Sequence, residues 1–216
     1  MSTGHDLLVF GGAARTGLAL VAHARRRGLR VAAFVRPGRD TAALAALGVT
    51  LVRGDAFSPE DCRHAFSETM PQAALSVLGG KDASGRRVDA EGNLNVIDAA
   101  EAWLPGLRFL LLTSVGCGEQ YAALPPPIRQ ALGEALEAKT RAEEHLRASS
   151  LAWTIVRPTG LADATPQGRY RLCETPEMAF TAYLARDDAA LAALEVLLAN
   201  DTRKRALSIL PESAGV

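Results

Sequence analysis

The stretch "FGGAARTG" at residues 10–17 follows a short apolar run and precedes a helical pattern. In a strand–turn–helix unit, a glycine-rich turn brings the backbone close to a diphosphate, which binds the free N–H groups of the helix N-terminus. Gly11 and Gly17 fit the first and last glycines of a G-x-x-G-x-x-G pattern, while Ala14 replaces the middle one. Gly12 gives the turn freedom to accommodate the extra methyl group, so the stretch predicts a dinucleotide site.

Short apolar runs alternate with longer helical patterns along the rest of the chain. Near-continuous apolar strands are expected where helices cover both faces of a parallel sheet. The pattern predicts an α/β fold: a Rossmann-like, doubly wound parallel sheet in a single domain over residues 1–216, with a small C-terminal extension on the substrate side. The predicted strands are 6–10, 29–35, 49–55, 73–80, 107–116 and 152–158, and the predicted helices are 16–27, 40–47, 58–66, 88–103 and 130–149.

Composition excludes several classes of protein. The 216 residues are 48% hydrophobic and 22% charged, and 24 basic residues balance 24 acidic ones. This balance provides no field that favours nucleic acid or an anionic membrane. No stretch approaches the roughly 20 apolar residues of a membrane span, and the three cysteines lack metal-ligand spacing. We therefore expect a cytoplasmic protein that binds no metal, nucleic acid or membrane.

The end of the second predicted strand indicates which dinucleotide binds. An enzyme that prefers NAD usually has an acidic residue there, which bonds the ribose hydroxyls of the adenosine. Here Arg36 follows the strand and the first acid is Asp40. Arg15, in the glycine turn, can reach the same region, and two guanidiniums suit a 2'-phosphate. The pair favours NADP(H) over NAD(H).

Two further turns offer cofactor contacts, each with a simpler alternative. Asp55, after the third strand, either accepts a hydrogen bond from the adenine amino group or caps the turn before Ser58. Gly79 and Gly80, after the fourth strand, either let the chain pass close to the adenosine ribose or form an ordinary turn.

An ordered set of segments resembles the atypical short-chain dehydrogenase/reductase superfamily, and within it the NmrA-like group that includes flavin reductase/biliverdin reductase B. In chain order the segments are "VFGGAARTG", "FVRPG", "VRGDAFSPE", "VDAEGNLNVIDAA", "FLLLTSVG", "AKTRAEEHLRASSLAWTIVRPTGL" and "ARDDAALAALEVLL". The resemblance implies a Rossmann-like sheet and NADP(H) binding.

The resemblance also implies roles for single residues. Lys139 matches a lysine that bonds the nicotinamide ribose, although its spacing also allows an exposed ion pair with Glu143. Ser114 falls where the superfamily keeps its active-site hydroxyl and is expected to orient the substrate, with Lys139 and Tyr121 as further catalytic candidates. The implied cofactor residues are Gly11, Gly12, Ala14, Arg15, Thr16, Gly17, Arg36, Asp55, Ala56, Leu78, Gly79, Gly80, Thr113, Lys139, Pro158 and Thr159.

Two departures from the family concern catalysis. The tyrosine that usually stands four residues before the lysine is replaced by Ala135, and the histidine near the substrate in the flavin/biliverdin reductases is replaced by Gly160. The remaining candidates for the proton donor are solvent, Tyr121 and Tyr170. Cys117 is interpreted as a small pocket or loop residue, because no basic neighbour is evident that would lower its pKa.

We expect an NADPH-dependent reductase that transfers hydride to a small conjugated acceptor such as a quinone, a flavin or an enone. The alternative is a non-catalytic NADP(H)-binding redox sensor or regulatory protein, and an epimerase or isomerase that retains its cofactor is less favoured. The loops at about 115–127 and 159–181 are expected to form the walls of the substrate site. The protein is expected to be a monomer or a homodimer.

Overall fold

The computed structural model describes residues 4–174 and 182–212. Its elements confirm the predicted alternation of strands and helices, with bounds that differ by a few residues. The strands are β1 (Leu7–Phe10), β2 (Val31–Val35), β3 (Thr50–Arg53), β4 (Ala73–Ser76), β5 (Arg108–Leu112), β6 (Ala152–Pro158), β7 (Gly160–Ala162), β8 (Tyr170–Cys173), β9 (Tyr183–Ala185) and β10 (Arg205–Pro211). The helices are α1 (Arg15–Arg26), α2 (Ala42–Ala46), α3 (Pro59–Thr69), α4 (Glu91–Trp103), the 3-10 helix η1 (Gly118–Ala123), α5 (Pro126–Ala148) and α6 (Arg186–Leu198).

An eight-stranded sheet forms the centre of the molecule, in the order β3-β2-β1-β4-β5-β6-β10-β8. All neighbouring strands in it are parallel except β10 and β8, which run antiparallel. The strand order reverses between β1 and β4, and sheets of this kind bind ligands outside the carboxyl ends of the strands at such a reversal. The predicted Rossmann-like, doubly wound sheet is thus confirmed.

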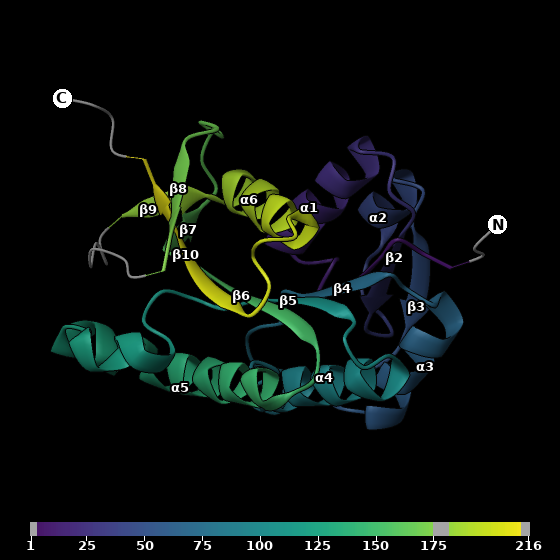
Figure 1. Ribbon diagram of the computed structural model, residues 1–216, viewed down its shortest axis with the longest axis horizontal. Coiled ribbons are helices and arrows are strands. Elements are labelled where there is room, and N and C mark those ends of the chain that lie inside the picture. Colours follow the sequence, from purple (N-terminus) through teal and green to yellow (C-terminus); the bar gives the residue numbers. More distant parts are fainter. Residues whose placement is uncertain (1–3, 175–181, 213–216) are drawn as a thin grey trace.

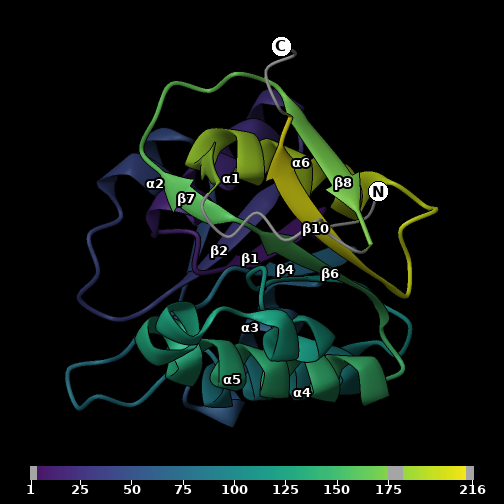
Figure 2. The same ribbon diagram turned by 90° about the vertical axis from the view of Figure 1, so that its left-hand side faces the viewer.

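Helices cover both faces of the sheet (Figures 1 and 2), with α1, α2 and α6 on one face and α3, α4 and α5 on the other. Each face has its own apolar core, one centred on residues such as Leu20 and Leu194, the other on residues such as Phe66 and Ile97. The strands between them are buried on both sides, which explains why they read as continuous apolar runs rather than alternating ones.

Local signals in the sequence set several element boundaries. Ser58 caps α3, because its hydroxyl accepts a hydrogen bond from the backbone N–H of Asp61 at 3.1 Å, and Pro59 takes the first helical position. Helix α5 begins at Pro126, four residues before the predicted start, because its first turn tolerates proline.

The region after β6 differs from the prediction of a long irregular loop. Strands β7 and β9 pair in parallel as a small separate sheet, and β8 extends the main sheet beside β10. Residues 163–169 of that predicted loop connect β7 to β8, and residues 175–181 lie outside the described residues. The predicted wall at 115–127 contains the short helix η1. No helix in residues 4–174 or 182–212 is long and apolar enough to cross a membrane.

Candidate cofactor and active site

The glycine turn joins β1 to α1 at the carboxyl edge of the sheet. Gly11 has a φ of 86°, a conformation that favours glycine, and its carbonyl accepts a hydrogen bond from the N–H of Ala14 at 3.0 Å. A Cβ on Gly17 would lie 2.2 Å from that same Gly11 oxygen, so only glycine lets the helix pack on the turn. Ala14 itself has a φ of −89° and a ψ of 160°, which any residue adopts. The alanine in the middle of the pattern therefore causes no backbone strain.

The N-terminus of α1 is open toward this turn. Its cap residue is Ala14, which has no side chain to accept a hydrogen bond, and the first turn of the helix contains no acidic residue. The leading N–H groups of a helix carry a partial positive charge and bind anions when no side chain caps them. The turn therefore fits a diphosphate.

Substitution of Gly17 by alanine is expected to destroy this fit. The new Cβ must push the helix away from the Gly11 carbonyl, and we expect a loss of about 2–4 kcal/mol in the free energy of unfolding and at least a tenfold weaker affinity for NADPH. Urea unfolding and equilibrium titration measure the two effects.

Gly12→Ala in the same turn is the matched control. Its Cβ would meet side-chain carbons at 3.3 Å or more, the nearest being that of Ala33, and no backbone atom as close as the Gly11 oxygen is to a Cβ at Gly17. A similar loss in both variants would contradict the role assigned to the close approach at Gly17.

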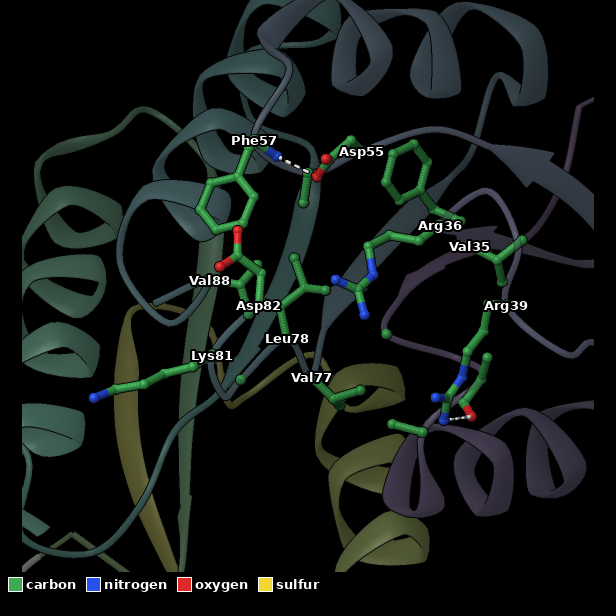
Figure 3. Close-up of a pocket in the computed structure, with 16 residues that line it drawn as sticks. Val35, Arg36, Arg39, Asp55, Phe57, Val77, Leu78, Lys81, Asp82 and Val88 are labelled. Carbon is green, nitrogen blue, oxygen red and sulfur yellow. Dashed lines mark hydrogen bonds between the residues drawn. The ribbon is translucent and has the colours of Figure 1, made fainter. Parts of the chain in front are cut away.

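A cavity of about 230 Å³ lies beyond the turn, over the ends of β1, β2 and β4 (Figure 3). Apolar side chains line much of it, and they can hold the flat face of an adenine base. The apolar lining consists of Phe34, Val35, Ala56, Phe57, Val77, Leu78 and Val88. Of the residues predicted from the sequence, Gly11, Ala14, Arg36, Asp55, Ala56, Leu78 and Gly79 line this cavity.

Two arginines line the same cavity after β2. Arg36, which the sequence analysis singled out, extends over the cavity toward Leu78 in Figure 3. Its companion is Arg39, which also donates a hydrogen bond to the carbonyl of Ala13 at 3.3 Å. The expectation that Arg15 joins Arg36 is not met, because Arg15 donates instead to the carboxylate of Asp163 at 2.8 Å, over a different cavity.

Asp55 has one of the two roles that the sequence left open, that of closing the turn. One carboxylate oxygen accepts a hydrogen bond from the N–H of Phe57 at 3.0 Å, which closes the turn before α3. The residue nevertheless lines the cavity, so its position also fits a contact with an adenine edge.

A second cavity, of about 300 Å³, continues from the first toward β5 and α6. The two share Ala14 and Val77, so they adjoin along the carboxyl edge of the sheet, and the pair of cavities is called the trough below. Of the predicted residues, Ala14, Arg15, Thr16, Gly17, Thr113 and Lys139 line the second cavity, joined by Val77, Leu112, Leu161 and Arg186.

Lys139 is held at this end of the trough by a buried carboxylate. Its Nζ lies 2.7 Å from the Oδ1 of Asp89, whose other oxygen accepts a hydrogen bond from the N–H of Gly80 at 2.9 Å. The alternative of an exposed ion pair between Lys139 and Glu143 is wrong, since Glu143 is buried and bonded elsewhere. Asp89 fixes both the ammonium and the turn at Gly79 and Gly80, a role that no spacing in the sequence indicates.

Thr113 is tied to a buried charge network. Its hydroxyl donates to the Oε1 of Glu143 at 2.6 Å, and Arg157 donates to both oxygens of that carboxylate at 3.0 and 2.5 Å. Arg157 also bonds Glu119. Burial by itself lowers the pKa of Arg157, but the hydrogen bonds to the two carboxylates outweigh it and raise the pKa. The network therefore stays charged and fixes the side chain of Thr113, a residue that lines the second cavity.

The three candidate hydroxyls for catalysis lie elsewhere. Ser114 is half-buried and donates to the carbonyl of Val115 at 3.1 Å, without lining either cavity. Tyr121 donates to Glu137 at 3.0 Å, and this bond raises its pKa, which makes it a weaker acid. Tyr170 bonds Glu195, and burial together with that bond raises its pKa as well.

The remaining predicted residues surround the trough without lining it. Gly12, Pro158 and Thr159 are buried, whereas Gly80 is exposed, and none of the four lines either cavity. The hydroxyl of Thr159 is buried and has no hydrogen-bond partner among the described residues. Cys117 is fully buried, and burial raises its pKa to about 12, so it is an unreactive core residue rather than a pocket residue.

The ring of Tyr183 fills the space that a side chain at Gly160 would need. A Cβ there would lie 2.8 Å from the ring of Tyr183, which pairs with Gly160 across β7 and β9 and is 69% exposed.

No group of three or more potential metal ligands is found in residues 4–174 and 182–212.

The trough, with its open helix N-terminus and its two arginines, fits a dinucleotide bound along the carboxyl ends of the strands. A family model described as NAD(P)H-binding matches residues 11–200. The chain therefore belongs to this NAD(P)H-binding family, and the likeness to atypical short-chain dehydrogenase/reductases of the biliverdin reductase-like group is confirmed.

Several individual proteins are similar to this chain. The structure resembles that of ChuY, an anaerobilin reductase from Escherichia coli O157:H7, with 28% identity, a TM-score of 0.85 and coverage of 97% of this chain and 98% of that one. A chloroplastic protein of Arabidopsis thaliana is 26% identical over 94% of this chain and 76% of its own length. A UPF0659 protein of Schizosaccharomyces pombe is 29% identical over 53% of this chain, and the match spans only 53% of that relative.

Proposed function

We propose that the protein is an NADPH-dependent reductase that transfers hydride to a small conjugated acceptor, such as a quinone, a flavin or an enone. The two adjoining cavities of the trough carry this proposal: Arg36 and Arg39 line the first, and Thr113 and Lys139 line the second. Similarity to a reductase over almost the whole chain supports it.

The preference for NADPH rests on the charges after β2. Arg36 and Arg39 line the adenosine end of the trough, and no carboxylate stands at the end of β2 to bond the ribose hydroxyls. A 2'-phosphate would accept hydrogen bonds there in which both partners are charged, whereas the neutral ribose hydroxyl of NADH would gain only weaker ones.

At the other end, the residues are suited to positioning rather than to acid catalysis. Lys139, fixed by Asp89, and Thr113, fixed by Glu143, offer an ammonium and a hydroxyl to the ribose next to the nicotinamide. When bound, the reduced nicotinamide supplies the hydride. Hydride transfer to a positioned acceptor needs orientation more than a strong acid.

The proton that completes the reduction comes from solvent. Each turnover consumes one acceptor, one NADPH and one proton, and yields the reduced acceptor and NADP⁺. Tyr121 and Tyr170 are both bonded to carboxylates that raise their pKa, and the position of Gly160 carries no side chain. A small molecule is thus the partner; the monomeric or homodimeric state and the cytoplasmic location stay predictions.

The missing proton donors also support a second candidate, a non-catalytic NADP(H)-binding sensor. A sensor needs the trough but no group that reacts with an acceptor. The two candidates make opposite predictions when NADPH consumption is followed by absorbance with a panel of quinones, flavins and enones.

We expect turnover with at least one class of acceptor. Thr113→Val is expected to lower kcat/KM by about tenfold to a hundredfold, because it removes one hydroxyl that positions the cofactor. Ser114→Ala in parallel tests the role predicted from the sequence: a larger loss there would place the acceptor against Ser114. Tight NADPH binding without turnover across the panel would favour the sensor.

A further inference from the structure

A carboxylate bridges two arginines that line the second cavity. Asp163, just after β7, accepts from Arg15 with its Oδ2 at 2.8 Å and from Arg186 with its Oδ1 at 2.7 Å. Arg15 belongs to the glycine turn and Arg186 opens α6, and both line the cavity. The bridge thus joins the glycine turn to the region after β6.

Both arginines stand where a cation does not stabilise a helix. Each is the first residue of its helix, α1 or α6, and the N-terminal end of a helix dipole is positive. The two helices lie side by side on one face of the sheet (Figure 1), so their starts gather positive charge in one place. This placement favours a role in binding an anion over a role in helix stability.

The other charged groups at this place are already engaged. Asp187 and Asp188 lie in the first turn of α6, but Asp187 faces His23 at 3.0 Å and Asp188 accepts from the N–H groups of Gln167 and Gly168. The first turn of α1 has no acidic residue. Asp163 therefore supplies the negative charge between the two guanidiniums, whose hydrogen bonds hold its pKa below the ordinary value, Arg186 contributing most.

A second hydrogen bond, besides the one to Asp163, orients the guanidinium of Arg186. Its Nη2 donates to the carbonyl of Leu161 at 3.2 Å, which leaves Nη1 without a hydrogen bond to any residue in the described part of the chain. Only about a quarter of the side chain is exposed, compared with 73% of the Arg15 side chain. A phosphate in the cavity would find one fixed guanidinium and one mobile guanidinium.

We propose that Asp163 occupies the place of a phosphate group, and that Arg186 and Arg15 bind the nicotinamide-side phosphate of the dinucleotide when it replaces this carboxylate. Arg186 is then a binding residue, and Asp163 is a competitor within the chain that weakens the affinity for the dinucleotide. The proposal depends on NAD(P)H binding alone and not on catalysis or on the acceptor.

Equilibrium binding by calorimetry tests this with two ligands. NADP⁺ carries the whole diphosphate, whereas adenosine 2',5'-bisphosphate ends at the adenosine-side phosphate and does not reach Arg186. Asp163→Asn removes the competing charge without changing the size of the side chain, and is expected to bind NADP⁺ about threefold to tenfold more tightly. Arg186→Ala is expected to bind NADP⁺ about tenfold more weakly while its affinity for the bisphosphate changes less than about twofold.

Glu174→Gln is the matched control, because Glu174 is exposed like Asp163 and pairs with Arg205 at 2.8 Å away from the trough. The gain in Asp163→Asn should shrink as salt is raised, since salt screens exposed charges. Repeating the series with NAD⁺ and AMP separates this proposal from the preference for a 2'-phosphate.

Unchanged or weaker NADP⁺ binding in Asp163→Asn would overturn the competitor role. An equal loss of both ligands in Arg186→Ala would show that the arginine only supports the shape of the trough. The bisphosphate also reports whether each variant is folded, because its own site at Arg36 is untouched.

Discussion

Replacing Arg157 by leucine is expected to lower the free energy of unfolding by about 3–5 kcal/mol, the largest effect of any single substitution considered. The guanidinium is 1% exposed and forms a two-pronged bond with Glu143, whose side chain is equally buried. Without it, a carboxylate remains in the core with the Thr113 hydroxyl as its partner, and an uncompensated buried charge is strongly destabilising. Urea unfolding measures the change.

Arg205→Leu is the matched control, because Arg205 also lies in a strand and pairs with a carboxylate, that of Glu174, but at the surface. Exposed pairs contribute about 0–1 kcal/mol. Replacing Arg157 and Glu143 together by leucine should recover much of the loss, since no charge is then left buried. If Arg157→Leu does not fold, Arg157→Lys can be measured in its place. It keeps the charge but loses the two-pronged hydrogen bond to Glu143, so it should be measurably less stable than the unmodified protein. A loss no larger than that of the control would refute the account of this network.

Removing the guanidiniums after β2 is expected to change which dinucleotide binds. Arg36→Ala and Arg39→Ala should each weaken NADPH binding by about tenfold or more, because each removes a charge-assisted contact to the 2'-phosphate, and should leave NADH within about twofold. Calorimetry or fluorescence titration with both cofactors gives the ratio directly.

Arg15→Ala is the informative control for this pair. Its guanidinium lies over the second cavity, beside Asp163, and should affect NADPH and NADH equally. Equal losses of the two cofactors in Arg36→Ala would contradict the 2'-phosphate site, and a selective loss in Arg15→Ala would restore the arrangement predicted from the sequence.

The fold could be predicted because its signals are local. Buried parallel strands read as apolar runs, Ser58 and Pro59 mark a helix start, and Gly11 and Gly17 mark the turn. Strands β7, β8 and β9 were not predicted, because they are short and partly exposed and no periodicity distinguishes them from a loop. Helix α6 and strand β10 also lie beyond the last predicted element.

The site was predicted where its residues follow a strand directly, as Arg36, Asp55 and Thr113 do. The partners that fix them come from distant parts of the chain: Asp163 reaches Arg15 across 148 positions, and Asp89 reaches Lys139 from the turn before α4. A lone aspartate or arginine in a polar stretch has no pattern that reveals such a partner. Arg39 is an exception, because it stands only three residues after Arg36 in the sequence and could have been predicted as the second arginine that lines the cavity.

Deuteride transfer tests the central claim most directly. NADPH deuterated at the transferring C4 position is incubated with the protein and an enone, and the reduced product is analysed by mass spectrometry. The account predicts one deuterium on the β-carbon, from the cofactor, and a solvent proton on the neighbouring carbon. Product without deuterium, or tight NADPH binding with no product from enones, quinones or flavins, would contradict a reductase.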